Sequence, residues 1–228
     1  MADSLDARVA AVAALEEPTR RRVYDHVARQ GEAVTKDEVA GACDLPRTTA
    51  AFHLDRLAEQ GLLDVVFERR TGRSGPGAGR PAKLYRRSAR QVEVTLPERR
   101  YELAGLLLAA AVEDAERTGE TPRTALDRRA EELGRSLGEA ARADSKQAGA
   151  GAESVLAVLE RHGFEPRVSE DGIALGNCPF HSLAHAHTAL VCGMNLCLLS
   201  GLLAGLGATG ARAELAPAAG HCCVRVRP

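Results

Sequence analysis

The sequence predicts an α+β protein with more than one domain, and three patterns in its 228 residues support this. Apolar residues recur at helical spacing through most of the segment from residue 4 to residue 137. Two short strand-like segments flank a stretch rich in Gly and Pro at residues 72–81. Further short strand-like segments follow residue 164, on both sides of a long apolar helix. Helices combined with small antiparallel sheets are typical of α+β domains.

The charge is spread unevenly along the chain, although the formal net charge is only −1. Residues 1–90 carry 16 basic and 13 acidic side chains, whereas residues 91–228 carry 14 and 18. A basic front joined to an acidic back is typical of a protein whose front contacts a polyanion. We therefore expect the N-terminal part of the chain to bind such a partner.

No secretory signal is visible, because the chain begins with the acidic segment Met1-Ala2-Asp3-Ser4. We expect a cytoplasmic protein with reduced thiols. The apolar stretch Ala189–Gly207 is long enough to span a bilayer. However, it contains Asn195, Ser200 and four glycines, and no cluster of positive charge flanks it closely. A buried helix of a soluble domain is the simpler interpretation, and we predict no membrane association.

The first sixty residues contain the signals of several helices. Thr35 followed by Glu38 is a capping box, which predicts the start of a short helix. After a turn, Pro46 starts a longer helix and Gly61 ends it. The predicted helices cover residues 4–16, 18–31, 36–42 and 46–60. A short helix, a tight turn and a longer helix form the helix-turn-helix pattern.

The longer helix has two different faces. At 100° per residue its apolar side chains fall on one side, which we expect to face the core. These are Ala50, Leu54, Leu57 and Ala58, whereas the other side carries Thr48, Thr49, Phe52 and Arg56. The polar set crowds the N-terminal half, the part of a recognition helix that meets base edges. An ordinary amphipathic hairpin with solvated polar residues is the alternative.

The next segment predicts a two-stranded wing. Residues 62–68 and 82–86 are strand-like and enclose the Gly/Pro-rich tip. Between Arg69 and Arg90 there are eight basic residues and no acidic one. Such a run is an electrostatic footprint for phosphates, although a charge run can also be a solvated surface.

Residues 18–87 resemble the winged-helix domain of ArsR-type bacterial repressors. The resemblance is carried by Arg47-Thr48-Thr49-Ala50-Ala51-Phe52-His53-Leu54, Leu57, Gly61-Leu62-Leu63 and Gly79-Arg80-Pro81-Ala82-Lys83-Leu84-Tyr85. It implies a winged helix-turn-helix domain over residues 1–90 that binds double-stranded DNA at an inverted-repeat operator. The DNA-contacting residues that we predict are Arg47, Thr48, Thr49, Phe52, His53, Arg56, Arg73, Arg80 and Lys83.

Residues 91–149 are predicted to be a helical connector. One helix covers 100–115 and another runs from Pro122 through Leu137, each with an apolar face. Homodimerisation through these faces is the expected use; bridging the two ends of one subunit is the alternative. Residues 150–228 then form a C-terminal α+β domain, with a helix from Ala152, strands near 164–169 and 172–176, the apolar helix, and strands near 211–215 and 221–227.

Five of the six cysteines lie in the C-terminal domain, together with five of the seven histidines. Cys178 lies at a strand-to-helix junction, Cys192 in the apolar helix, and Cys222 and Cys223 on the last predicted strand. Thiolates suit zinc, copper(I) and iron–sulfur clusters. Strand alternation favours Cys222 over Cys223 as a ligand, whereas Cys43 and Cys197 are expected to be small buried hydrophobes.

The histidines leave alternatives open. Cys178 and His181 have the Cys-x-x-His ligand spacing, so His181 could complete a zinc site. Each histidine could equally be a surface or helix-capping residue. A thiol enzyme with Cys178 as nucleophile and His181 as base is a further alternative, but no CxxC pair, phosphate loop or paired carboxylates accompany them.

The order of these motifs is similar to that of SufR-like iron–sulfur regulators. A winged helix is followed by Cys178-Pro179-Phe180-His181, then Val191-Cys192, then a terminal cysteine pair. The resemblance implies a homodimeric repressor, not an enzyme, that holds a [2Fe–2S] or [4Fe–4S] cluster through Cys178, Cys192 and Cys222 or Cys223. The fourth ligand stays open: it could be His181, a non-cysteine group, or absent. A zinc- or other metal-responsive regulator is the alternative.

Overall fold

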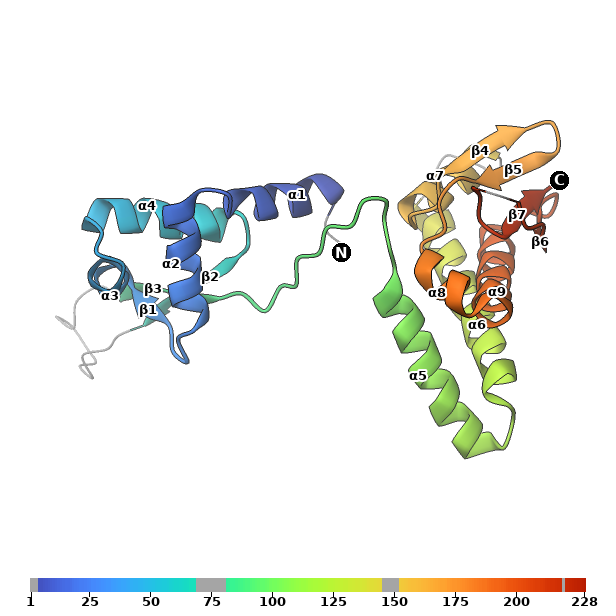
Figure 1. The fold of residues 1–228 in the computed structure, drawn as a ribbon, viewed down its shortest axis with the longest axis horizontal. Helices are drawn as coiled ribbons and strands as arrows, with labels where there is room; N and C mark the ends of the chain where they lie inside the picture. The colour runs from blue at the N-terminus through green and yellow to red at the C-terminus, as the bar shows by residue number, and fades with distance from the viewer. Residues whose placement is uncertain (1–3, 69–80, 145–151, 219) are drawn as a thin grey trace. The chain divides into compact units, whose positions relative to one another are not determined.

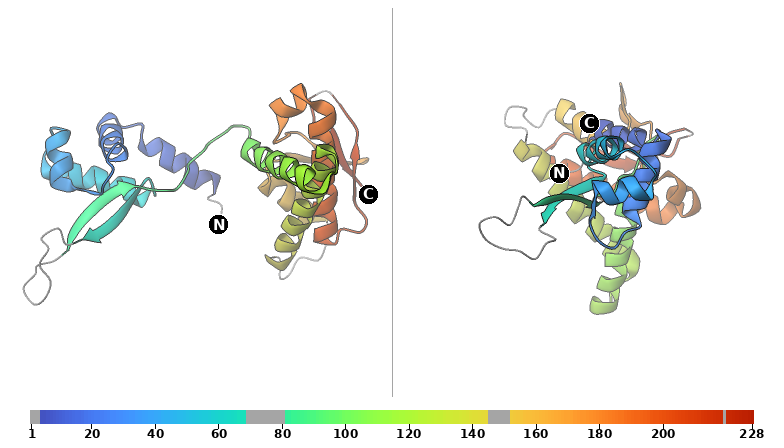
Figure 2. Two further views of the ribbon diagram at one scale, coloured as in Figure 1. Left: turned by 90° about the horizontal axis from the view of Figure 1, so that it is seen from below. Right: turned by 90° about the vertical axis from the view of Figure 1, so that its left-hand side faces the viewer.

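The computed structural model describes residues 4–68, 81–144, 152–218 and 220–228. The chain divides into two compact units, called unit 1 (Met1–Val94) and unit 2 (Thr95–Pro228). Figures 1 and 2 show the helices and strands of each. Both units combine helices with a small antiparallel sheet, as the predicted α+β class requires.

Unit 1 packs its helices against a three-stranded antiparallel sheet with the order β1-β3-β2. The elements in its described part are α1 (Leu5–Ala14), α2 (Pro18–Ala28), β1 (Val34–Thr35), α3 (Lys36–Ala42), α4 (Arg47–Glu59), β2 (Leu63–Glu68) and β3 (Ala82–Arg87). Its core joins Val23 of α2, Val39 of α3 and Leu54 of α4 with Tyr85 of β3. This order of helices and strands is that of a winged helix.

Local signals position the two central helices of unit 1. The Thr35 hydroxyl accepts a hydrogen bond from the Glu38 backbone N–H at 3.1 Å, and a Glu38 carboxylate oxygen lies 2.6 Å from the Thr35 N–H. The predicted capping box is thus confirmed. Asp44, with φ 49°, makes the turn between α3 and α4, and Gly61, with φ 69°, follows the end of α4.

The two wing strands pair along their whole length. Val65 of β2 lies opposite Tyr85 of β3, and Glu68 lies opposite Ala82. The predicted strands therefore form, with β3 one residue longer than expected. The Gly/Pro-rich tip, with Arg73 and Arg80, lies outside the described residues.

Unit 2 places helices on a four-stranded antiparallel sheet with the order β4-β5-β7-β6. Its elements in the described part are α5 (Tyr101–Thr118), α6 (Pro122–Asp144), α7 (Ala152–Arg161), β4 (Pro166–Ser169), β5 (Gly172–Leu175), α8 (His181–Ala186), α9 (Thr188–Leu206), β6 (Arg212–Leu215) and β7 (Val224–Arg227). The last strand begins at Val224 rather than near residue 221 as predicted, because residues 221–223 lack the strand pairing.

Helix α9 is the central helix of unit 2. It is long and apolar enough to cross a membrane, but most of it is buried within the unit. Gly201 and Gly205 of α9 face α6, and a Cβ on either would collide with the carbonyl oxygen of Glu131 or Arg135. Gly134 of α6 meets the backbone of α9 in the same way. The two backbones therefore touch, as the Gly-x-x-x-Gly spacing of Gly201 and Gly205 allows.

The separate connector predicted over residues 91–149 differs from the structure. Helices α5 and α6 share one hydrophobic core with the C-terminal segment, including Leu107, Leu126, Leu199 and Val224. Because α6 lies directly on α9, residues 95–228 form one unit rather than a connector and a sensor domain.

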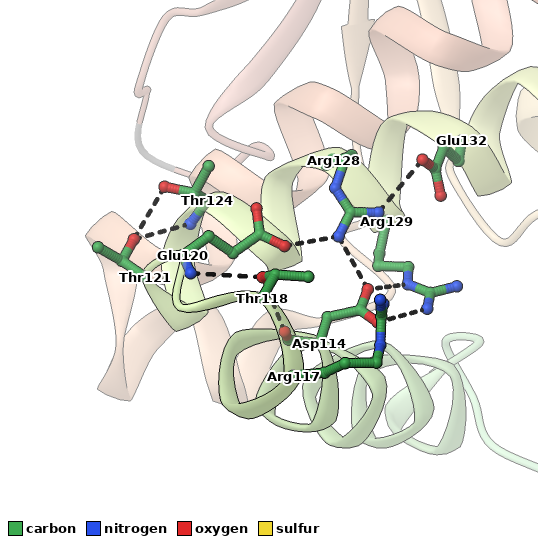
Figure 3. Close-up of polar contacts among 9 residues, drawn as sticks. All are labelled: Asp114, Arg117, Thr118, Glu120, Thr121, Thr124, Arg128, Arg129 and Glu132. Carbon is green, nitrogen blue, oxygen red and sulfur yellow. Dashed lines mark hydrogen bonds and ion pairs between the residues drawn. The ribbon is translucent and has the colours of Figure 1, made fainter.

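A buried carboxylate fixes the α5–α6 hairpin (Figure 3). Asp114 of α5 is 3% exposed and accepts hydrogen bonds from three arginines. The distances are 2.6 Å from Arg129 Nε, 2.8 Å from Arg128 Nη2 and 2.6 Å from Arg117 Nη2. The hydrogen bonds from these guanidiniums hold the pKa of Asp114 far below its usual range, and the largest contribution comes from Arg129. The pairing makes α5 part of unit 2 rather than a free arm.

Candidate functional site: a recognition helix and a cysteine cluster

Helix α4 exposes the side chains that the sequence predicts for DNA. Thr48, Phe52 and Arg56 are exposed, and the Phe52 ring is 62% accessible. Thr49 is half-buried. A large exposed aromatic ring beside an arginine fits apolar contact with a thymine methyl and hydrogen bonding to guanine.

The predicted phosphate and base contacts already pair with acids of unit 1. Arg47 Nε lies 2.9 Å from Asp37, and Arg56 Nη1 lies 3.1 Å from Glu59. These pairs are exposed, so each contributes little to stability. A phosphate or a guanine can replace such an acid at small cost.

A third pair links the recognition helix to the wing. Asp55 of α4 accepts a hydrogen bond from Lys83 Nζ at 2.5 Å and from Tyr85 Oη at 2.7 Å, both on β3. Desolvation raises the pKa of Asp55, but the hydrogen bonds from Lys83 and Tyr85 outweigh it, so the pKa is lowered. The carboxylate therefore stays charged and holds the strand that leads from the wing tip against the helix.

His53 does not lie where the predicted DNA contact requires. It is 7% exposed on the core side of α4, with Nδ1 3.5 Å from a Glu17 carboxylate oxygen. Burial, partly offset by Glu17, lowers the pKa of His53. Because the ring is enclosed, we leave His53 out of the DNA-contacting set. The turn of the helix that carries Phe52 outward carries the next residue inward.

The structure brings four cysteines together from three places in unit 2. Cys178 follows β5, Cys192 lies on α9, and Cys222 and Cys223 precede β7. Three of the thiols are buried and Cys223 is half-buried. Side-chain contacts join Cys178 with Cys222, and Cys192 with Cys223.

Both members of the terminal pair therefore face the cluster. Strand alternation predicts that only one of Cys222 and Cys223 does so. The rule does not apply, because regular pairing starts only at Val224 and the two cysteines lie in irregular backbone. The Cys222 N–H is still fixed, by a 2.9 Å hydrogen bond to the Leu175 carbonyl.

The thiols differ in acidity. A hydrogen bond from Cys222, with help from the Phe180 N–H and the charge of Arg99, outweighs burial and lowers the pKa of Cys178 to about 7. The same bond and burial raise the pKa of Cys222. Burial and Cys223 raise the pKa of Cys192 to about 12. Of these three thiols, Cys178 is thus the one that most readily becomes a thiolate.

Asn195 is a site residue that the sequence reasoning missed. It is 1% exposed, and its Nδ2 donates a hydrogen bond to Cys222 Sγ at 3.3 Å. Its buried Oδ1 accepts no hydrogen bond from the described residues. The available signal was a single amide in an apolar helix, one turn after Cys192 and so on the same face.

His181 and Cys197 lie apart from the four thiols. His181 is exposed at the start of α8, and its backbone N–H donates to the Cys178 carbonyl at 3.1 Å. Cys197 packs at the edge of the core, where Asp127 and Glu131 contribute to raising its pKa after burial. His181 therefore supports the loop through its backbone, and Cys197 is half-buried rather than fully buried as predicted.

The donor set fits a thiolate-bound metal group in its chemistry. Four free thiols meet in an apolar setting, and the Asn195 Oδ1 beside them lacks a partner within the described residues. Among those same residues, no group of three or more Cys, His, Asp or Glu side chains is arranged to hold a metal ion directly. The two pairs would have to draw together around the group.

The chain matches the helix-turn-helix domain family over residues 15–66. That range contains α2, α3 and α4 and the beginning of β2. The match supports a DNA-binding transcription regulator of the ArsR or MarR winged-helix type rather than an enzyme. No curated protein and no solved structure matches the chain. The match ends before the four clustered cysteines and does not extend into unit 2.

Proposed function

We propose that the chain is a cytoplasmic repressor that binds an inverted-repeat operator as a homodimer and senses iron–sulfur status through Cys178, Cys192, Cys222 and Cys223. The helix-turn-helix match supports the DNA-binding half. The observation that carries the sensing half is the meeting of four free thiols from a loop, a helix and the approach to a strand.

Exposed apolar side chains on two helices support pairing with a second copy. Leu106 and Val112 of α5 are 63% and 49% exposed, although α5 also contributes to the core of unit 2. Leu5, Val9 and Val12 form an exposed stripe on α1. Helix-turn-helix proteins read two half-sites as dimers, so the operator symmetry follows from such pairing.

When bound, the cluster supplies redox- and oxygen-sensitive chemistry. The surrounding residues prepare the site for it. Cys178 provides the most acidic of the three clustered thiols whose pKa is shifted, the apolar residues of α9 limit access of water, and Asn195 donates to the Cys222 sulfur. Hydrogen bonds to sulfur and burial are the means by which a protein adjusts such a group.

A zinc-responsive regulator is the second candidate, and the thiol set itself favours it. Four cysteines also form one of the ordinary structural zinc sites. The structure adds no support for a thiol enzyme. The His181 side chain is exposed whereas Cys178 is buried, and a nucleophile and its base need to share one site.

The visible absorption spectrum, iron, sulfide and zinc content of anaerobically purified full-length protein test the proposal. We expect a brown protein with stoichiometric iron and sulfide. Single serine substitutions of Cys178, Cys192, Cys222 or Cys223 should abolish the colour, since serine is a poor ligand for soft metals. Cys43→Ser and Cys197→Ser are the matched controls and should keep it. A colourless zinc protein would establish the second candidate, and a metal-free protein would contradict both.

A further inference from the structure

The segment that leads into α5 is hydrogen-bonded to the loop that carries Cys178. Arg99 Nη1 donates to the Asn177 side-chain oxygen at 2.5 Å and to the Cys178 carbonyl at 2.8 Å. These bonds join positions nearly eighty residues apart in the sequence. Bonds to a guanidinium are among the stronger ones in proteins, because the donor is charged.

Asn177 returns the contact from the loop. It is 5% exposed, and its Nδ2 donates to the Glu98 carbonyl at 3.0 Å and to the Gly163 carbonyl at 2.6 Å. The Arg99 side chain thus bonds to the carbonyl of Cys178, next to Asn177, and the Asn177 side chain bonds to the carbonyl of Glu98, next to Arg99. Truncating either would leave buried polar groups without partners, which is costly.

Further bonds extend the attachment along the chain. The Arg100 N–H donates to the Pro179 carbonyl at 3.0 Å, and the Tyr101 hydroxyl lies 2.8 Å from Ser182 Oγ. In the opposite direction, the Arg99 N–H donates to Thr95 Oγ1 at 2.9 Å. Thr95 is the first residue of unit 2, directly after the end of unit 1 at Val94.

We propose that Arg99 is a positioning residue that transmits the state of Cys178 to the segment 95–101, through which unit 2 is joined to the DNA-binding unit. This inference rests on the proposed sensing function. Ligation of Cys178 displaces its loop, and the Cys178 carbonyl and Asn177 carry the guanidinium with them. The segment between the units then changes its conformation, and this alters how the recognition helices of the dimer meet the two DNA half-sites.

Coupling between two sites is reciprocal, so operator binding should also shift the balance between the loop conformations that differ in the exposure of Cys178. This consequence can be measured without any metal. The readout is the alkylation rate of Cys178 in metal-free full-length protein, followed by mass spectrometry of its peptide. The ligand is a DNA duplex selected by the wild-type protein from a random pool, and an unselected duplex is the control.

In the wild type, the selected duplex should change the Cys178 alkylation rate by about fivefold or more, the lower end of ordinary coupling factors. Arg99→Met should reduce this factor to about one while DNA affinity and thiol count stay unchanged. Arg99→Lys keeps the charge without the paired donor geometry, so it should restore the factor only in part and provides a second variant if methionine impairs folding. Arg135→Met, which removes an exposed arginine paired with Glu131 at 2.8 Å, is the matched control and should behave as wild type.

The outcomes distinguish a failure of the role of Arg99 from a failure of the sensing function. If the wild type couples and both Arg99 variants couple equally well, the role of Arg99 is wrong while the sensing function stands. If selected DNA leaves Cys178 unchanged even in the wild type, the coupling that the sensing function requires is absent and both fail.

Discussion

The two units place their candidate functional residues in opposite environments. In unit 1 the side chains proposed for DNA, such as Phe52 and Arg56, project from the surface, and the core lies behind them. In unit 2 the proposed ligands Cys178 and Cys222 belong to the hydrophobic core itself. Unit 1 can therefore change its surface contacts without repacking, whereas any change at the cysteines must alter the packing of unit 2.

The strongest test of this contrast is the α6–α9 contact. Gly201→Ala should destabilise unit 2 by about 3 kcal/mol or more, because the added methyl collides with backbone that cannot move aside. Full-length protein should then show two separated unfolding transitions in urea, with that of unit 1 unchanged.

Gly105→Ala is the matched control. Gly105 lies in α5 with no heavy atom near the position of a new Cβ, so alanine should stabilise unit 2 by about 0.5–1 kcal/mol. Equal destabilisation by both substitutions would show that the helix backbones do not touch as described.

A medium-sized effect should distinguish the two units in acid. Burial first, then Arg100 and Arg161, lowers the pKa of His162 in unit 2 to about 4. The neutral ring stabilises the fold above pH 6.5, and this contribution is lost as the pH falls towards 4, because the unfolded chain takes up the proton first. After allowance for partial exposure, we expect a loss of about 2 kcal/mol in unit 2.

His162→Gln should remove this acid sensitivity, measured as the unfolding free energy of unit 2 between pH 7 and pH 4.5. In unit 1, Glu17 partly offsets the effect of burial on the pKa of His53. The unfolding free energy of unit 1 should therefore decline less over the same pH range. If the unfolding free energy fell more steeply in unit 1 than in unit 2, His162 would not be the main source of acid sensitivity.

The smallest effect concerns the link between helix and wing. Asp55→Asn weakens the bonds from Lys83 and Tyr85, which are worth about 1 kcal/mol at this exposure, so discrimination between selected and random DNA should fall about fivefold. Asp64→Asn removes the same charge from β2 and should raise affinity for all DNA without changing discrimination. Competition binding measures both, and equal discrimination in the two variants would show that Asp55 acts only through its charge.

Unit 1 was predictable because its signals are local. The capping box at Thr35, the stop at Gly61 and the helical spacing of Leu54 and Leu57 each act within a few residues. His53 was misplaced although it lies three residues after Ala50 and four before Leu57, on the apolar face of the helix, where its ring lies near Glu17.

Unit 2 was predictable only in part, because its site is built by contacts between distant segments. The sequence identifies the cysteines, but it cannot show that Cys223 meets Cys192 or that Asn195 contacts Cys222. The separation of a connector from a sensor failed for the same reason. Gly134 and Gly201 are far apart in sequence, yet they bring α6 and α9 into backbone contact.

The affinity of full-length protein for its selected operator, with the cluster bound and after its removal, tests the central claim most directly. The account predicts at least an about fivefold difference between the two states. It also predicts that Cys178→Ser has the affinity of the cluster-free state under both conditions, while Cys43→Ser responds as wild type. Equal affinity in the two states, although the cluster has gone, would show that the cysteines only stabilise unit 2 and would contradict the sensing function.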